Sequence, residues 1–231
     1  MISIIIPTFN EEENIERVLE FLNSHSKSYE CEILVVDGGS SDSTIKVAKA
    51  LGARVFNSPE KGRAKQMNFG AENAAGEVLY FLHADTIPPP DFLQEISQKI
   101  TQGFDSGCFR LSFDNPHPML KFYSWFTRFD VLIFRFGDQS LYTKKALFQN
   151  AGGFDENLLV MEDQEIIRRL KHHSQFSLIK KAVVTSARKY DQLGVFKLQY
   201  IFTIITLLYY IGVSQKVLVD FYTKACAGNQ Y

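Results

Sequence analysis

The sequence lacks the cysteine pattern of a disulfide framework or a zinc site. It has three cysteines in 231 residues, and none of them forms a CxxC pair: Cys31, Cys108 and Cys226. Scattered cysteines of this kind predict small, buried apolar side chains in a reducing compartment. We therefore expect a cytoplasmic protein.

The sequence also lacks a hydrophobic run of transmembrane length. The most apolar stretch, Tyr200–Val213, has 14 residues, whereas a helix that spans a bilayer needs about 20. The apolar run Ile2–Ile6 is too short for a signal peptide and has no basic flank, so we expect none.

Charge of one sign does not dominate the chain. The formal net charge is -1, which argues against nucleic acid as a partner. Eight of the lysines and arginines fall between Arg168 and Lys197, with Asp191 as the only acid there. That segment is either a solvated surface or a patch for phosphates or anionic lipid. The GxGxxG spacing is absent from the turn Gly38–Ser43, which argues against a dinucleotide site.

The pattern of apolar residues predicts an α/β fold with a mostly parallel sheet flanked by helices. Four short apolar runs read as buried strands, and each is separated from the next by a helical pattern: Ser3–Pro7, Glu32–Val36, Ala53–Phe56 and Val78–Leu82. Strands that alternate with helices favour parallel pairing with right-handed crossovers. We expect one domain over residues 1–190, followed by a helical segment over residues 191–231 that contains one long apolar helix.

Polar residues follow the ends of three predicted strands: Asn10 with Glu12, Asp37, and Asp85. The carboxyl ends of parallel strands meet at one edge of a sheet, where open α/β sheets bind ligands. A carboxylate there, facing a phosphate, would anchor Mg²⁺ or Mn²⁺, and we assign this role to Asp85 with His83 beside it. Asn10 and Asp37 could instead be an ordinary helix cap and a turn residue.

Two further groups are candidates for chemistry. Arg63 opens a helix rich in small residues, and because a cation there opposes the helix dipole, we expect an anion such as a pyrophosphate as its partner. Glu162 and Asp163 open a later helix. They are either partners of the dipole or include a general base that deprotonates an acceptor hydroxyl.

Taken together, these segments resemble a family 2 glycosyltransferase of the GT-A fold. The resemblance covers about Met1 to Arg188, and within the family the chain looks most like a bacterial subgroup linked to arsenosugar biosynthesis. It rests on these motifs in chain order: SIIIPTFNEEENI, VVDGGSSDST, GRAKQMNFGAENAAG, HADT, GDQ, GGFDE, MEDQEIIRRL and TSAR.

The resemblance implies a nucleotide-diphosphate sugar, with UDP or GDP, as the donor. Asn10, Glu12 and Asp37 would hold the base and ribose, and Arg63 would meet the diphosphate, with Arg188 near it. Asp85 would be the metal-binding acid of the DxD-type motif. The sequence departs from that motif, because it reads HAD and has His83 in place of the first acid.

The resemblance also implies inverting transfer to an acceptor hydroxyl. Asp163 would be the general base, with Glu162 beside it. The acceptor side would be shaped by Asp138, Gln139 and Gly153.

Two alternatives to this function remain. A non-catalytic member of the same fold would bind a nucleotide sugar or a partner without turnover. A sugar nucleotidyltransferase is less well supported, because it would begin with a glycine-rich basic loop.

The apolar segment Phe196–Tyr222 is either a core or homodimer helix or an interfacial helix on the inner face of a membrane. The interfacial position would suit a lipid-linked acceptor.

Overall fold

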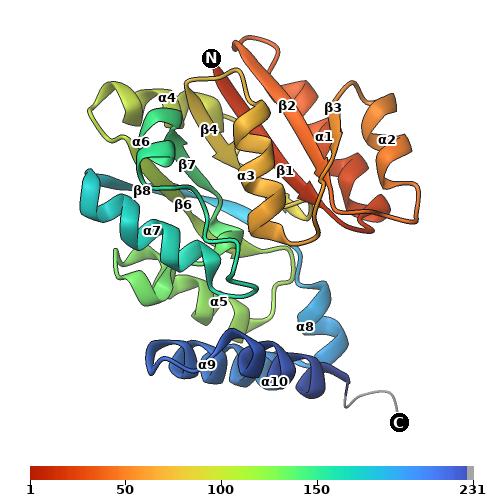
Figure 1. Ribbon diagram of the computed structural model, residues 1–231, viewed down its shortest axis with the longest axis vertical. Helices are drawn as coiled ribbons and strands as arrows, with labels where there is room; N and C mark the ends of the chain where they lie inside the picture. The colour runs from red at the N-terminus through yellow and green to blue at the C-terminus, as the bar shows by residue number, and fades with distance from the viewer. Residues whose placement is uncertain (228–231) are drawn as a thin grey trace.

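The computed structural model of the chain describes residues 1–227 and is built around one eight-stranded sheet (Figure 1). The order of its strands is β3-β2-β1-β4-β7-β6-β8-β5. The strands are β1 Ile2–Thr8, β2 Cys31–Asp37, β3 Arg54–Asn57, β4 Val78–Phe81, β5 Thr86–Ile87, β6 Ser106–Phe113, β7 Leu141–Lys144 and β8 Phe176–Thr185.

The sheet is mixed, which corrects the expectation of a mostly parallel one. The strands β1 to β4 pair in parallel, as their alternation with helices predicted. In the second half, β7 runs antiparallel to both β4 and β6, and β5 runs antiparallel to β8. Helices also separate later strands along the chain, such as residues 92–101 between β5 and β6, so alternation alone does not dictate parallel pairing there.

Ten helices surround this sheet in the described part of the chain. They are α1 Glu12–His25, α2 Thr44–Ala50, α3 Arg63–Asn73, α4 Phe92–Thr101, α5 Pro118–Trp125, α6 Lys145–Asn150, α7 Glu162–His173, α8 Arg188–Leu193, α9 Val195–Tyr210 and α10 Gln215–Ala227. Three short 3₁₀ turns lie between α5 and β7: η1 Phe126–Arg128, η2 Leu132–Phe134 and η3 Gly137–Gln139.

The two faces of the sheet have separate cores. One core packs apolar residues of α1, α2 and α4 against the sheet, and the other packs α3, α6 and α7 against the opposite face. Because β1, β2 and β4 are buried on both faces, they consist of continuous apolar runs. Their carboxyl ends point toward the lower edge of the sheet in Figure 1, which is where the predicted site residues follow them.

The C-terminal segment contains two helices where one long apolar helix was expected. The helix α9 ends at Tyr210, and Gly212, with a φ of 82°, lies in the turn that leads to α10. The two helices pack on each other and lie below the carboxyl edge of the sheet in Figure 1. In the part of the chain that the structure describes, no helix is long and apolar enough to span a membrane. Residues 228–231 of the predicted segment lie outside the described residues.

The cysteines only partly match the expectation of burial. Cys108 is buried, whereas Cys31 and Cys226 are half-buried, and all three are free thiols.

Candidate functional site

Asp85 lies at the carboxyl edge of the sheet, four residues after the end of β4. The strand direction continues through Leu82, whose backbone N–H donates to the carbonyl of Ile5. The Asp85 backbone carbonyl accepts from Ser186, while its side chain accepts only a long bond of 3.4 Å from Thr86. Among residues 1–227 the Asp85 carboxylate forms no ion pair. Its oxygens are therefore free to accept a ligand.

His83 is oriented by Asp138 of the GDQ segment. The Nδ1 atom of His83 lies 2.8 Å from Oδ1 of Asp138. Burial lowers the pKa of His83, but this hydrogen bond, together with the negative charges of Asp138 and Asp163, raises the pKa above its usual value. For Asp138, burial opposes the charge, yet the bond to His83 lowers the pKa of the carboxyl. Both shifts favour the charged forms of the two side chains.

Arg63 meets carboxylates of the protein itself. Its guanidinium lies 3.4 Å from Glu162 Oε1 and 3.9 Å from Asp163 Oδ2. Desolvation would lower the pKa of Arg63, but these two carboxylates, with Asp138 and Asp85, hold its pKa above the usual range. The sequence predicted an anion as the partner of Arg63. In the structure, four carboxylates of the protein itself surround this arginine.

Asp163 has the most strongly perturbed carboxyl of the group. Burial, followed by the charge of neighbouring Glu162, raises the pKa of Asp163 to about 7. A carboxylate whose pKa lies near neutrality suits a general base. Glu162 is almost fully buried, and its Oε1 accepts no hydrogen bond within the described chain, so Arg63 is its main neutralising contact.

Gly137 allows Asp163 and His83 to come together. A β-carbon at this position would overlap the Asp163 carboxylate and would lie 2.9 Å from Cε1 of His83. The glycine is therefore required for space, because the backbone here lies outside the left-handed region.

The predicted nucleotide-binding residues join two neighbouring loops. Asn10 was considered as a helix cap, but its φ is 54° and α1 begins two residues later, so this alternative is wrong. The Asn10 side chain accepts from the backbone of Ser41. The Glu12 side chain accepts from the backbone of Ser43.

Asp37 is buried, and donors of the protein occupy the acceptor positions of its carboxylate. Oδ2 accepts from the backbone N–H groups of Gly39 and Ser40, and Oδ1 accepts from the hydroxyls of Ser40 and Thr8. A carboxylate has about four acceptor positions. In this conformation Asp37 therefore shapes the loop, and its predicted contact with a ribose or base stays a prediction.

The remaining predicted residues lie around this group. The Arg188 guanidinium lies 3.4 Å from Glu11, which places the TSAR segment beside the loop that carries Asn10. Gln139 is buried, and its amide nitrogen has no partner in residues 1–227. Gly153 has a φ of 69° and passes close to the Asn68 side chain.

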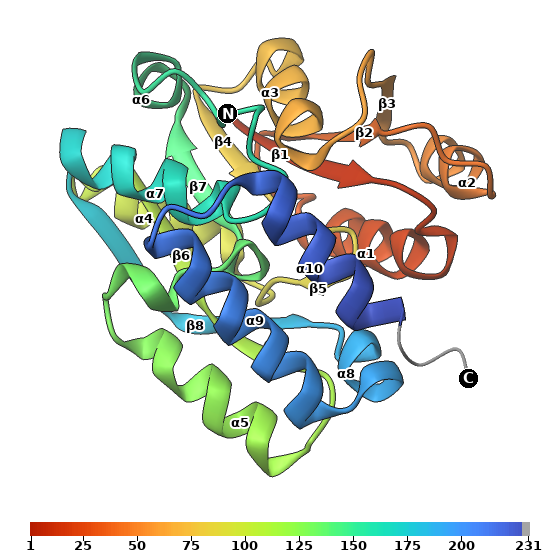
Figure 2. The same cartoon turned by 60° about the horizontal axis from the view of Figure 1, so that its bottom comes forward.

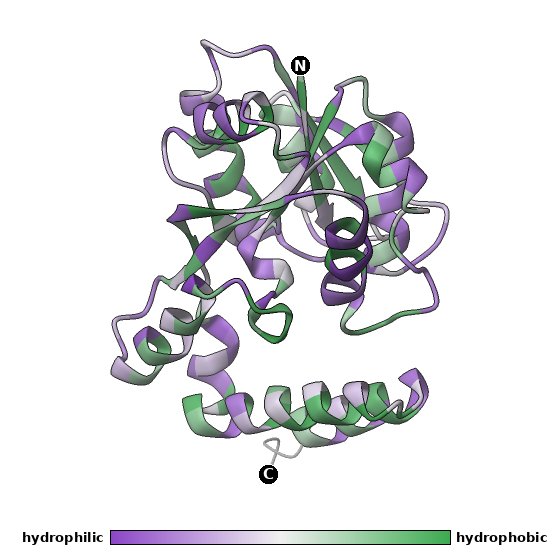
Figure 3. Ribbon diagram, turned by 90° about the vertical axis from the view of Figure 1, so that its left-hand side faces the viewer, coloured by the Kyte–Doolittle hydropathy of each residue, from purple (hydrophilic) through white to green (hydrophobic). Residues whose placement is uncertain are grey.

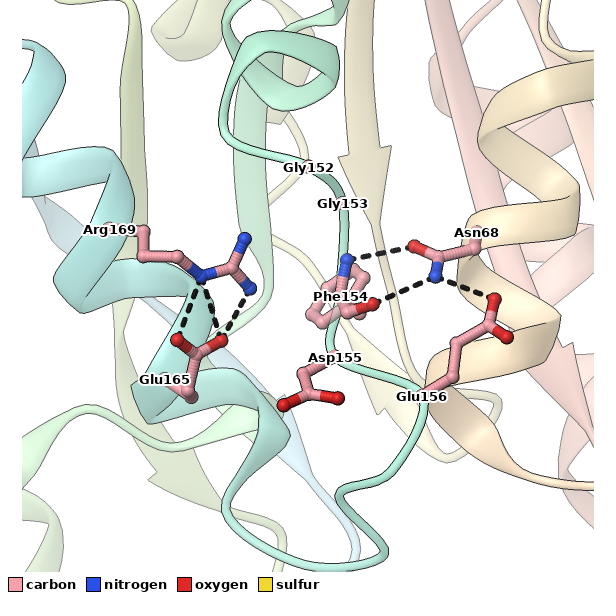
Figure 4. Close-up of a pocket in the computed structure, with 8 residues that line it drawn as sticks. All are labelled: Asn68, Gly152, Gly153, Phe154, Asp155, Glu156, Glu165 and Arg169. Atoms are coloured by element: carbon pink, nitrogen blue, oxygen red, sulfur yellow. Dashed lines mark hydrogen bonds and ion pairs between the residues drawn. The ribbon is translucent and has the colours of Figure 1, made fainter.

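Two polar residues of α3 make structural contacts that were not predicted from the sequence. Gln66 is buried and donates to the backbone carbonyls of Thr8 and Val36, which ties together the ends of β1 and β2. Asn68 accepts from the backbone N–H of Phe154 and donates to its carbonyl (Figure 4). A polar side chain on the small-residue helix was the available signal for both.

A hollow of about 510 Å³ lies beside this group, between α3 and α7. Figure 4 shows the Glu165–Arg169 ion pair on one side of it and Asn68 with Glu156 on the other. Neither Asp85 nor Asp163 lines the hollow, so it is a neighbouring feature and not the centre of the site.

The donor set suits a metal that is bound partly by substrate. In residues 1–227, no three His, Cys, Asp or Glu side chains are grouped so that they could hold a metal. Mg²⁺ commonly takes one or two protein carboxylates and completes its shell with phosphates and water. The free oxygens of Asp85, within a group of four carboxylates and one arginine, fit that pattern.

Comparison with known proteins identifies the family of the chain. The model of the family described as glycosyl transferase family 2 matches residues 3–152. The chain belongs to glycosyl transferase family 2. A dolichol-phosphate mannosyltransferase of Pyrococcus furiosus is 31% identical over 109 residues, which are 45% of this chain and 31% of that protein.

A second relative is an undecaprenyl-phosphate 4-deoxy-4-formamido-L-arabinose transferase of Shewanella sediminis. It is 28% identical over 116 residues, which are 46% of this chain and 34% of that protein. This family 2 chain therefore matches about a third of the length of both curated relatives.

Solved structures share the fold of this family 2 chain. The mannosyltransferase PcManGT of Pyrobaculum calidifontis, in complex with GDP-Man and Mn²⁺, has a TM-score of 0.70 and 18% identity, covering 90% of this chain and 61% of that one. TarS of S. aureus, residues 1–349 with UDP-GlcNAc, has a TM-score of 0.68 and 20% identity, covering 87% of this chain and 66% of that one. At these identities the likeness establishes the fold.

Proposed function

We propose that the chain is an inverting glycosyltransferase that moves a sugar from a nucleotide-diphosphate sugar to an acceptor hydroxyl, with Asp163 as the general base. The observation that carries the proposal is the Asp163 carboxyl, whose side chain is only 14% exposed and whose pKa is raised to about 7, beside Arg63 and opposite His83. In this reaction the acceptor oxygen bonds to the anomeric carbon as the bond from that carbon to the diphosphate breaks. The hydroxyl proton passes to Asp163, and the nucleoside diphosphate leaves.

Arg63 would stabilise the charge that grows on the leaving diphosphate. In the absence of donor it is held by Glu162 and Asp163, so it is already positioned beside the base. The loops joined by Asn10, Glu12 and Asp37 would hold the base and ribose, with Arg188 at their border. Asp138, Gln139 and Gly153 would shape the acceptor site.

Asp85, with His83 beside it, would hold a divalent ion, Mg²⁺ or Mn²⁺. Such an ion supplies Lewis-acid stabilisation of the departing phosphate oxygens. The four carboxylates around Arg63 leave the group with a net negative charge, which favours a divalent cation.

We further propose that the donor carries UDP or GDP and that the acceptor is lipid-linked. Relatives named for dolichol phosphate and undecaprenyl phosphate support the lipid-linked acceptor. The transferase domain would occupy residues 1–190, with residues 191–231 as a helical segment, in a protein at the inner face of a membrane. The arsenosugar-linked subgroup belongs to the same proposal, and a homodimer through the C-terminal helices is the alternative to the membrane position.

The test begins with thermal unfolding against a panel of nucleotide sugars, with and without Mn²⁺ or Mg²⁺. A ligand that binds only the folded state raises the unfolding temperature. We expect a rise for one donor that requires the metal and is lost in Asp85→Ala.

Transfer of that sugar is then measured for the wild type and Asp163→Asn. Removal of a general base typically costs about 10²–10⁴-fold in rate, and donor-induced stabilisation should survive. Unchanged transfer in Asp163→Asn would refute the assigned base. Donor binding by the wild type without any transfer would favour the non-catalytic alternative.

A further inference from the structure

Helix α9 exposes a stripe of large apolar side chains. Phe196, Tyr200 and Leu207, with Ile211 directly after the helix, have exposed fractions of 67%, 65%, 53% and 75%. Their spacing places them on one side of the helix. The opposite side, with Leu198, Ile201 and Ile205, is buried against the protein.

A second set of exposed aromatic residues belongs to the same layer. Phe122, Trp125 and Phe129 are each more than 40% exposed, on α5 and just after η1. The buried side of α5 joins that of α9 in one apolar cluster, through Leu120 and Leu198. Figure 2 shows α5, α9 and α10 together on the face turned toward the viewer, and Figure 3 shows hydrophobic residues along the two C-terminal helices.

Charge distinguishes this layer from the rest of the molecule. Residues 118–136 and 195–227 hold six lysines and arginines against two aspartates, whereas the remainder holds 19 basic and 24 acidic residues. One of the six, Arg135, is buried, which leaves five basic side chains for the surface. Lys121, Arg128, Lys216 and Lys224 are exposed. One of the two aspartates, Asp130, is neutralised by an ion pair with Lys171.

We propose that this layer is a docking surface for a bilayer with anionic headgroups. We call it the aromatic-basic surface and define it as Phe122, Trp125, Phe129, Phe196, Tyr200, Leu207, Ile211, Lys121, Arg128, Lys216 and Lys224. Aromatic and aliphatic side chains bordered by lysine and arginine are typical of segments that lie in the membrane interface. Basic residues near an anionic leaflet add electrostatic attraction.

The charge of this surface argues for lipid over a second copy of the chain. A two-fold dimer would place the same patch on both subunits, and its positive charges would then repel one another. An anionic bilayer complements both the apolar stripe and the lysines.

This inference rests on the proposed function for one consequence only. The docked helices also contact the catalytic helix, because the Tyr210 hydroxyl donates to Gln164 of α7. A lipid-linked acceptor hydroxyl would therefore approach Asp163 from the docked side.

The test uses the full chain and flotation with phosphatidylcholine vesicles, with and without phosphatidylglycerol. We expect the wild type to float with the anionic vesicles and to be released by salt, since screening weakens the attraction. Tyr200→Ser should reduce the vesicle partition coefficient roughly tenfold, by loss of buried apolar area. Tyr29→Ser, which changes an exposed tyrosine far from this surface, should leave it unchanged.

A matched pair of charge variants tests the electrostatic contribution to membrane binding. Lys216→Glu/Lys224→Glu should weaken binding to anionic vesicles by roughly fivefold or more for each lysine replaced. Lys46→Glu/Lys49→Glu makes the same charge change on exposed positions of α2 and should bind like the wild type.

Three results would overturn the docking surface. The first is a wild type that does not bind anionic vesicles, and the second is an equal loss of vesicle binding in the surface and control variants. The third is a dimer in solution that Tyr200→Ser converts to monomer. Donor-induced stabilisation is measured on the same variants and should be unchanged. Failure of donor binding in every protein would instead count against the proposed function and would leave the vesicle result standing.

Discussion

At the scale of single residues, Asp138 compensates for the unusual His83. The resemblance expects an acid at the position of His83, and the histidine alone would remove a negative charge from the edge of the sheet. The hydrogen bond of 2.8 Å between His83 Nδ1 and Asp138 Oδ1 brings a carboxylate to the far side of the imidazole ring. It also fixes the orientation of the imidazole, as carboxylates do for metal-binding histidines. A segment distant in sequence therefore supplies the carboxylate that contacts His83.

Gly137 carries a prediction at the same scale. In Gly137→Ala the new methyl group would displace the Asp163 carboxylate and press on His83. Misplacement of a reacting group by about 1 Å can cost roughly 10²-fold in rate. We expect a loss of that size in kcat, with donor-induced stabilisation retained, from kinetics and thermal unfolding on the same preparation.

Gly103→Ala is the control for this variant, because a methyl group there meets no atom within 4 Å. Its φ of 91° makes the substitution costly for folding, on the order of 1–2 kcal/mol, but the folded fraction should be fully active. Equal kcat losses in the two variants would show that Gly137 has no special role in the site.

At the scale of elements, α10 holds the segment that leads into α7, the helix that begins with Glu162 and Asp163. The Oε1 atom of Gln215 accepts from the backbone N–H groups of Leu159, at 3.0 Å, and Val160, at 3.1 Å. Met161 follows with a φ of 69°, a left-handed conformation that costs about 1–2 kcal/mol for a non-glycine residue. The contact from α10 therefore helps to hold the strained turn from which Glu162 and Asp163 project.

Gln215→Ala should release this segment. We expect faster hydrogen exchange at the Leu159 and Val160 amides and a lower kcat, with a loss of stability of about 1 kcal/mol from the missing hydrogen bonds. Gln192→Ala, at an exposed position on α8, is the matched control. If the exchange rates of both amides stay at the wild-type values, α10 does not position the segment that leads into α7.

The same scale explains how much the sequence could predict. The strands β1 to β4 follow from local apolar runs and were predicted nearly to their ends, and the start of helix α7 was predicted at Glu162. The antiparallel course of β7 depends on pairings between distant segments, whereas the break between α9 and α10 has a local signal, Gly212, that the sequence analysis did not use. The bonds of Asp138 to His83 and of Asn68 to Phe154 join residues 55 and 86 positions apart. A single sequence contains no signal for such contacts beyond the unusual residue type.

At the scale of the whole molecule, the candidate site lowers stability as the pH rises. Burial and Glu162 raise the pKa of Asp163 to about 7 in the folded chain, against about 3.9 in the unfolded chain. The folded state therefore binds the proton more tightly. The stabilisation is fully present below about pH 4 and is lost as the pH rises through 7.

This linkage predicts the unfolding behaviour of the metal-free chain. Between about pH 4 and pH 8, the free energy of unfolding of the wild type should fall by on the order of 2–4 kcal/mol more than that of Asp163→Asn, measured by urea titration with a chelator present. The raised pKa of His83 acts in the same direction and remains in both proteins, so a smaller fall persists in the variant. Asp220→Asn, at an exposed position on α10, should follow the wild type. Parallel curves for wild type and Asp163→Asn would show that Asp163 is already ionised throughout this range, which would also remove the physical basis for assigning it as a base that titrates near neutral pH.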